Sequence, residues 1–220
     1  MNKWLFRYKW GDYMNYGINI VRKNDLKTSK WSGGTTTQLM IYPQDSLYSE
    51  RNFKWRLSSA KVDVEESIFT SLPEIWRIIM VIEGELKLEH KGHHKASLKP
   101  FQQDSFSGGY ETRSFGKVTD FNLMMGKGCN GAIEHISLNN GDSKIITFTN
   151  DKGEDFTEIT EVFYCVDGEI DILTENNEKI TLFQGDLISV TRSEKANPLT
   201  FKFSNNKEAV VKIIKAAIYY

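Results

Sequence analysis

The sequence predicts an all-β protein with two tandem β-barrels or jelly rolls, because three features recur along it. An apolar run that ends in a glycine turn occurs twice, before Gly84 and before Gly168. A polar corner with an aspartate follows each time, at Asp104 and at Asp186. Short strand-like segments recur at near-regular spacing, with only four prolines and no long segment of helical period. A tandem duplication of one β unit explains the repeats.

Each copy is predicted as strand, glycine turn, strand, polar tip, strand, acidic corner and strand. Residues 78–82 are rich in branched apolar side chains, which suit a buried pleated surface. After the turn, Leu86 and Leu88 alternate with charged residues, as in a strand with one solvated face. Pairing Leu88 with Leu98 predicts a tip at 92–94.

The second hairpin is predicted to be one rung shorter than the first. Pairing Ile172 with Ile180 leaves a tip at 175–177. This difference accounts for the offset between the copies, because the turn glycines lie 84 positions apart and the aspartates only 82.

We expect three parts in the chain. An N-terminal segment, 1–50, supplies strands and a Gly/Thr loop that pack on the barrels, the first barrel covers 51–127, and the second covers 128–220. A chain of 220 residues with 40% hydrophobic content is long enough for a substantial core.

The overall charge and the cysteines restrict the partners and the compartment. The formal net charge of −1 argues against broad attraction to nucleic acids or anionic membranes. Cys129 and Cys165 give neither a disulfide framework nor a metal-ligand spacing. No secretory core segment is present, and no apolar run reaches the roughly 18 residues of a membrane span. These observations predict a reduced, cytoplasmic protein with no membrane partner.

Several further segments are interpreted as strands and loops. Gly33 and Gly34 precede a threonine-rich run that ends at Pro43, which predicts a tight loop leading into an extended segment. A phosphate-binding loop would need a following helix, which this run does not favour. Residues 52–62 and 119–125 are predicted strands, and the tail 209–220 fits either a strand or a helix.

The order of strand, glycine turn, hairpin and acidic corner resembles the cupin barrel, and two copies resemble a bicupin. The chain is similar to the HutD/Ves family in ordered blocks at 31–38, 55–62, 67–77, 100–104 and 120–124. This resemblance implies an association with histidine utilisation in some bacteria and with stress responses in others. It also implies a regulatory role and binding of a pathway intermediate such as formylglutamate.

The metal-binding residues of the cupin superfamily are missing from this chain. Their pattern has a His-x-His pair and then a glutamate seven positions before the turn glycine. Counting back from the turns gives Arg77 in the first copy and Glu161, a lone candidate ligand, in the second. No histidine lies in 69–73 or after His135. We therefore predict no metal and no cofactor.

Three of the four histidines surround the first hairpin tip, namely His90, His93 and His94. A solvated tip explains them better than a catalytic site, because a catalytic imidazole needs an orienting partner and a sheltered cavity. His90 is the exception to consider, since it shares a face with Leu86 and Leu88.

The inward face of the first barrel is the predicted site. It carries Arg56, Ser58, Arg77, Asp120 and Asn122. A guanidinium inside a barrel keeps its charge, so it must be paired or await an anion. One interpretation is a bidentate clamp on a small carboxylate, with Asn122, Ser58 and Thr36 adding neutral hydrogen bonds. The other is an internal salt bridge from Arg77 or Arg56 to Asp104 or Asp120.

Three functions follow from these residues. The first is a metal-free bicupin that binds a small carboxylate such as formylglutamate and has a sensing or accessory role. The second is an enzyme, an isomerase or a hydrolase, that uses Asp120 or Glu161 as acid or base. The third is a structural protein that forms a homodimer, for which the aromatic residues Trp4, Phe6, Tyr8 and Trp10 offer a surface.

Overall fold

The structure, a computed structural model, describes residues 16–149, 156–193 and 195–220. Contacts divide the chain into two units. The first unit is Leu26–Ile133, and the second is Glu134–Tyr220 with the residues before Leu26. The segment predicted as one part, 1–50, is therefore shared between both units. The aromatic residues at 4–10 lie outside the described part of the chain.

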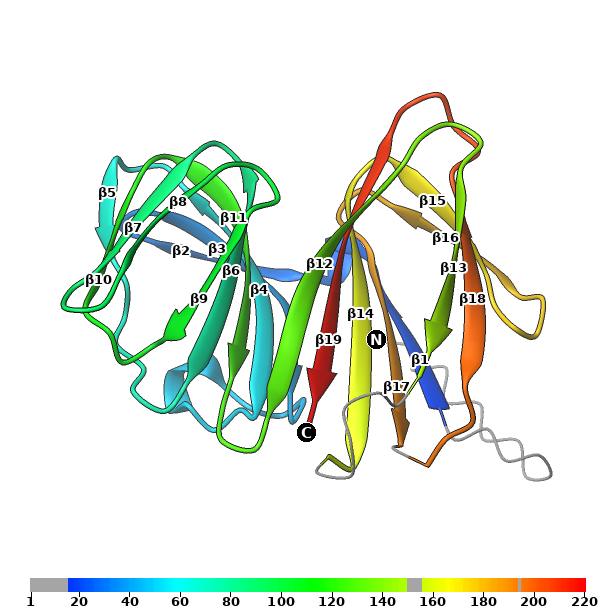
Figure 1. Ribbon diagram of the computed structural model, residues 1–220, viewed down its shortest axis with the longest axis horizontal. Coiled ribbons are helices and arrows are strands. Elements are labelled where there is room, and N and C mark those ends of the chain that lie inside the picture. Colours follow the sequence, from blue (N-terminus) through cyan, green and yellow to red (C-terminus); the bar gives the residue numbers. More distant parts are fainter. Residues whose placement is uncertain (1–15, 150–155, 194) are drawn as a thin grey trace. The chain divides into compact units, whose positions relative to one another are not determined.

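The first unit consists of two sheets that enclose a core (Figure 1). The larger sheet has six strands and the smaller has four. In spatial order, the larger sheet contains β2 (Lys27–Trp31), β3 (Gly34–Tyr42), β4 (Trp55–Val62), β11 (Val118–Met125), β6 (Trp76–Glu83) and β9 (Gln103–Ser107), and the smaller contains β5 (Glu66–Ile68), β10 (Thr112–Phe115), β7 (Leu86–His90) and β8 (Lys95–Leu98). One 3₁₀ turn, η2 (Tyr48–Glu50), precedes β4.

The second unit repeats this arrangement with a five-stranded and a four-stranded sheet. Their spatial orders are β1 (Tyr16–Val21), β17 (Leu187–Ser193), β14 (Glu158–Asp167), β19 (Val211–Tyr219) and β12 (Asn130–Leu138) in the larger, and β13 (Ser143–Phe148), β18 (Leu199–Ser204), β15 (Glu169–Leu173) and β16 (Lys179–Phe183) in the smaller. A 3₁₀ turn, η1 (Lys23–Asp25), follows β1. The tail is thus a strand, and no helix among the described residues could span a membrane.

The two hairpins have the same register, at a constant offset of 84 positions. Leu86 pairs with Leu98 in the first, as Ile170 pairs with Leu182 in the second. The predicted pairing of Ile172 with Ile180 is confirmed. The prediction for the first copy is wrong by one rung, because Leu88 pairs with Ala96 and not with Leu98. This shift of two residues leaves every side chain on its predicted face.

The acidic corners also follow the offset of 84, so the two aspartates are not counterparts. The backbone N–H of Lys99 donates to the side chain of Gln102 over 2.9 Å, as that of Phe183 donates to Asp186 over 3.2 Å. Asp104 pairs with Ile79 on β6, which corresponds to the pairing of Ile188 with Phe163 on β14. Asp104 therefore occupies the position of a buried isoleucine in the second unit.

Alternating residues of the larger sheet of the first unit face its core. Ile79 and Val81 of β6 pack with Leu86 and Leu88 of the smaller sheet. Side chains of neighbouring strands that stand in register with Ile79 and Val81 share this face. The turn between the sheets needs glycine at Gly84, where φ is +86° and a Cβ would lie 2.5 Å from the carbonyl oxygen of Lys117.

Candidate functional site

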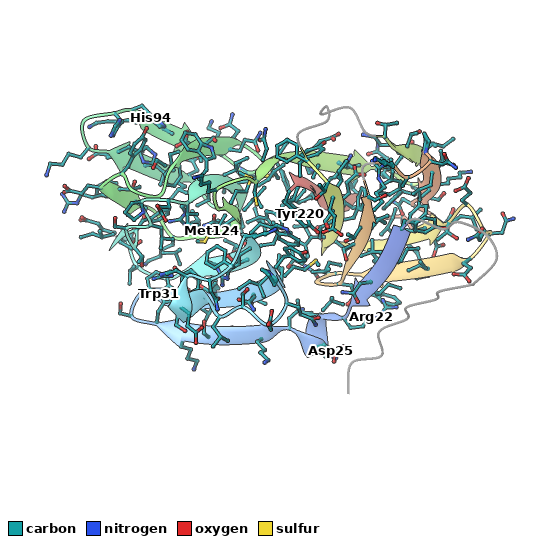
Figure 2. The ribbon with its side chains drawn as sticks, turned by 90° about the horizontal axis from the view of Figure 1, so that it is seen from below. Arg22, Asp25, Trp31, His94, Met124 and Tyr220 are labelled. Carbon is teal, nitrogen blue, oxygen red and sulfur yellow. The ribbon has the colours of Figure 1, made fainter. Side chains whose placement is uncertain are left out.

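The strand registers place five of the six predicted site residues on the interior face of the first unit. Asn122 of β11 lies between Ser58 of β4 and the core residue Ile79 of β6. One row further along, Arg56 and Arg77 lie on either side of Met124, which Figure 2 labels within this unit. Asp120 lies in the next row in the opposite direction, beside Val81. All five are buried.

Thr36 is placed further from the two arginines than the prediction assumed. It lies opposite Ala60 on β3, in the row of Asp120. Within the described part of the chain, no side-chain hydrogen bond joins Thr36 to the other predicted residues. The neutral partner of Arg56 is instead Gln38, which stands in register with Ser58.

The Arg77 guanidinium is buried near two aromatic rings and makes no hydrogen bond to the described residues. Its Cζ lies 4.5 Å from the ring centroid of Phe69 and 5.5 Å from that of Phe106. Its Nε is sealed from solvent and has no hydrogen-bond partner. Burial lowers the pKa of Arg77 to about 10, against the opposing effect of Asp120, so the group is charged at neutral pH. A guanidinium has no acceptor atoms and five N–H donors in its plane, so an anion would bind at its N–H edge.

Arg56 has neutral partners only. Its Nε donates to Gln38 Oε1 over 3.0 Å and its Nη1 to Ser58 Oγ over 3.1 Å. Its Cζ lies 4.4 Å from the ring centroid of Tyr48. Burial lowers the pKa of Arg56. The second guanidinium of the interior is therefore held in place without a counter-charge.

Asp120 and Asn122 each leave an acceptor unused. The Oδ1 atoms of both side chains are buried and have no hydrogen-bond partner. Burial raises the pKa of Asp120 to about 7, while Arg77 and the backbone N–H of Ala60 act in the opposite direction. Near neutral pH this carboxyl group therefore exists in both forms, and its neutral form can donate a hydrogen bond.

The structure does not contain the internal salt bridge of the second interpretation. In the described ranges, no carboxylate oxygen lies within 4.0 Å of a guanidinium nitrogen of Arg56 or Arg77. Asp104, one of the two proposed partners, is engaged by His90 and His94 instead. Among the described residues, this face thus holds two guanidinium groups and, in Asp120, one carboxyl group, which leaves at least one positive charge in excess.

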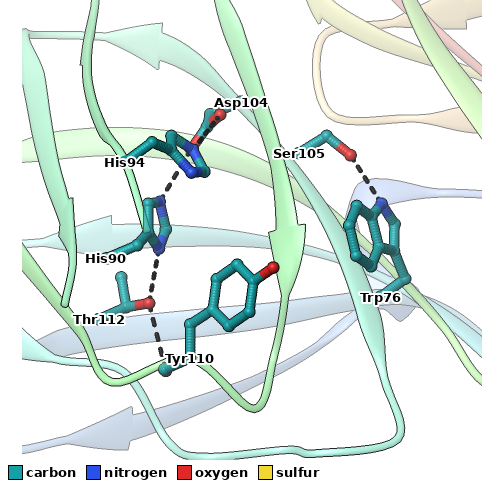
Figure 3. A network of polar contacts seen from close by, with 7 residues as sticks. All are labelled: Trp76, His90, His94, Asp104, Ser105, Tyr110 and Thr112. Carbon is teal, nitrogen blue, oxygen red and sulfur yellow. Dashed lines mark hydrogen bonds and ion pairs between the residues drawn. The ribbon is translucent and has the colours of Figure 1, made fainter. Parts of the chain in front are cut away.

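His90, the exception among the tip histidines, is not solvated. Its side chain is fully buried, with Nδ1 2.8 Å from Thr112 Oγ1 and Nε2 2.9 Å from Asp104 Oδ2 (Figure 3). His94 Nε2 lies 3.1 Å from both oxygens of Asp104. Burial lowers the pKa of His90, against the effect of Asp104. The face that His90 shares with Leu88 was the signal for its burial.

Glu161, the lone candidate ligand in the second unit, is held by cations. Its Oε1 lies 2.7 Å from Lys215 Nζ, and its Oε2 lies 3.9 Å from Arg192 Nη2. All three side chains are at most one-fifth exposed. The short ion pair therefore engages Oε1, while Oε2 has no hydrogen-bond partner among the described residues.

Comparisons with known proteins agree with this architecture. Residues 23–211 match the model of the HutD family. The chain belongs to the HutD family. Structures of similar fold include a conserved protein of unknown function from Pseudomonas aeruginosa, which is 21% identical with a TM-score of 0.74, over 91% of this chain and 98% of that one.

Two further structures place the HutD chain in a wider fold group. The HutD protein of Pseudomonas fluorescens, solved in a formate condition, is 22% identical with a TM-score of 0.64, over 91% of this chain and 98% of that one. A mutant of the oxalate decarboxylase of Bacillus subtilis is 6% identical with a TM-score of 0.64, over 90% of this chain and 76% of that one. These likenesses establish a cupin-type all-β fold for the chain.

Proposed function

We propose that this HutD-family protein is a bicupin that binds a small carboxylate in the interior of its first unit. A sensing or accessory role in histidine utilisation fits both the family and the absence of a complete set of catalytic groups among the described residues of this interior. The observation that carries the proposal is the excess of buried positive charge. Two guanidinium groups without an ion pair are costly to bury, and a bound anion offsets that cost.

The donors suit a carboxylate better than a neutral ligand. Arg77 has its N–H edge free of hydrogen bonds to the described residues, and planar guanidinium groups bind carboxylates through two parallel bonds. Arg56 and Arg77 lie on the two strands that flank β11. Neighbouring strands lie about 4.8 Å apart, so the backbones of the two arginines are about 10 Å apart. A short dicarboxylate such as formylglutamate could contact both.

The neighbouring polar atoms extend this interpretation. Neutral Asp120 can donate to a ligand oxygen, and the free Oδ1 of Asn122 can accept from an N–H such as that of a formamide. The similar proteins support the ligand class, since one is a decarboxylase of oxalate and another is a HutD protein solved in a formate condition.

Titration calorimetry tests the proposal directly. The purified protein is titrated with formylglutamate, glutamate, oxalate and formate, and we expect at least one to bind in a 1:1 ratio. Arg77→Met keeps an unbranched side chain and removes the donors, so its affinity should fall at least tenfold. Arg113→Met, which removes an exposed arginine of the same unit, should bind as the wild type does. No binding to the wild type, or equal losses in both variants, would refute the site.

An acid–base enzyme is the second candidate, and the pKa of Asp120 favours it. A carboxyl group that titrates near pH 7 is suited to proton transfer at neutral pH. Incubation of the same carboxylates with the protein, followed by proton NMR, would reveal an isomerised or hydrolysed product. Asp120→Asn should then abolish turnover while ligand binding persists. Binding without any product in the wild type favours the sensing role.

A further inference from the structure

We propose that His90, His94 and Asp104 form a binding site for a divalent transition-metal ion of the zinc class at the rim of the first unit. Figure 3 shows the three side chains converging from the β7–β8 hairpin and from β9. This cluster lies outside 69–77, where a metal-binding cupin would carry its first ligands. It also departs from the sequence-based prediction that the chain holds no metal.

The donor atoms are spaced as a metal requires. His90 Nε2 lies 2.9 Å from Asp104 Oδ2, and His94 Nε2 lies 3.1 Å from the same oxygen. All three ligand atoms lie within 4.8 Å of one another. Zinc bonds to nitrogen and oxygen are about 2.0 to 2.2 Å long, so tetrahedral ligands lie about 3.3 Å apart. Small side-chain shifts suffice to seat an ion among the three atoms.

A second layer of contacts orients His90 for ligation. Its Nδ1 lies 2.8 Å from Thr112 Oγ1, whose hydroxyl donates to the carbonyl oxygen of Tyr110 over 3.3 Å. Thr112 can then accept the Nδ1 proton of His90, which directs the Nε2 lone pair at Asp104. Two acceptors that face each other need a proton or a cation between them. Metal-binding histidines commonly have this kind of partner on the other ring nitrogen.

The second unit shows that the fold does not require these residues. At the constant offset of 84, the positions of His90, His94 and Asp104 correspond to Thr174, Glu178 and Ile188 in the second unit. Ile188 packs in that unit's hydrophobic core. A partly buried carboxylate in place of a core isoleucine costs stability unless it is bonded. The first unit therefore carries a polar cluster that its architecture does not explain.

The site is accessible from solvent. The side chain of His94 is 42% exposed and that of Asp104 is 13% exposed. An open depression of about 600 Å³ at the hairpin tip is lined in part by His90 and His94, although not by Asp104. Two lysines at this tip are each paired with a carboxylate, so the rim carries little excess positive charge. Three protein ligands with one side open resemble sites where water or substrate completes the metal's coordination.

Metal binding is tested on protein without an affinity tag, after treatment with a chelator and dialysis. Titration calorimetry with Zn²⁺ should give a 1:1 complex of micromolar or tighter affinity, and Co²⁺ should give a visible absorption spectrum of a four- or five-coordinate ion. His94→Ala and Asp104→Asn should each weaken Zn²⁺ binding at least 100-fold. His93→Ala is the matched control, because His93 shares the tip but stacks on Tyr110, and it should bind as the wild type does.

Thermal unfolding separates a folding defect from a lost ligand. Without metal, His94→Ala should melt close to the wild type, because His94 is half exposed at a hairpin tip. Saturating Zn²⁺ should raise the melting temperature of the wild type and of His93→Ala, but not that of His94→Ala or Asp104→Asn. Absence of stoichiometric binding in the wild type, or an equal loss in His93→Ala, would show that the cluster is a hydrogen-bonded triad only.

Discussion

The interiors of the two units carry different charged side chains at equivalent positions. Arg77 stands seven residues before the turn glycine of the first unit, where the second unit has Glu161. Asn122 lies opposite Ile79 in the first unit. At the equivalent position of the second unit, Lys215 lies opposite Phe163. Glu161 and Lys215 form an ion pair of 2.7 Å, whereas Arg77 makes no hydrogen bond or ion pair within the described residues.

This difference shows that the repeated scaffold does not determine what its interior does. In the second unit the buried carboxylate lies between two cations, with Glu161 Oε1 2.7 Å from Lys215 Nζ and Oε2 3.9 Å from Arg192 Nη2. The first unit leaves two guanidinium groups without a carboxylate within 4.0 Å in the described ranges. The two units thus differ in whether a carboxylate contacts their buried cations, and the proposed anion site lies in the unit where none does.

Removal of the central charge should affect the two units very differently. Glu161→Ala leaves Lys215 and Arg192 without their counter-charge, and loss of one partner of a buried pair costs about 3 to 5 kcal/mol. Arg77→Met removes a buried charge that has no ion pair, so stability should change by about 1 kcal/mol or less. Urea denaturation of the three proteins measures both effects.

A double variant controls this experiment. Glu161→Met combined with Lys215→Met replaces both charged groups with apolar ones, and it should recover much of the stability lost in Glu161→Ala. Equal destabilisation by Glu161→Ala and Arg77→Met would contradict the comparison, because it would mean that Arg77 has a stabilising partner in the protein.

The turn glycines should also differ, although both have a φ of +86°. A Cβ at Gly84 would lie 2.5 Å from the backbone oxygen of Lys117, which cannot move without disturbing the sheet. A Cβ at Gly168 would meet a Val211 methyl group at 3.0 Å, which can shift. Gly84→Ala should therefore cost about 2 to 3 kcal/mol and Gly168→Ala about 1 kcal/mol. Melting temperatures in the opposite order would show that the first turn is the more adaptable one.

The sequence predicts which side of a strand a residue faces far better than it predicts which residue it meets. The inward faces of β4 and β11 follow from a period of two, which is a local property of a strand. The position of Arg77 follows in the same way from its distance to Gly84. The all-β fold and its two-sheet units were predictable for this reason.

The contacts within the site depend on pairings between distant segments, which a single sequence does not encode locally. Gln38 reaches Arg56 through the register of β3, and a β-bulge between Gln38 and Met40 shifts that register. The burial of His90 depends on Thr112 and Asp104, which lie on other strands. The predicted hairpin register was wrong by one rung, which kept every side chain on its predicted face but changed the residue opposite it.

The last difference we predict is a pH dependence of stability that arises from Asp120 in the first unit. Asp120 corresponds to Ile213, because each lies opposite the equivalent residue of β6 or β14. Its pKa is raised from 3.8 to about 7, so the stability contributed by its neutral form is complete below pH 3.8 and is lost as the pH rises through 7. Between pH 6 and pH 8 the wild type should lose about 1.4 kcal/mol more than Asp120→Asn, which cannot ionise. Chemical denaturation at both pH values measures this difference. If the two proteins show the same pH dependence, Asp120 does not titrate between pH 6 and pH 8, and this prediction is wrong.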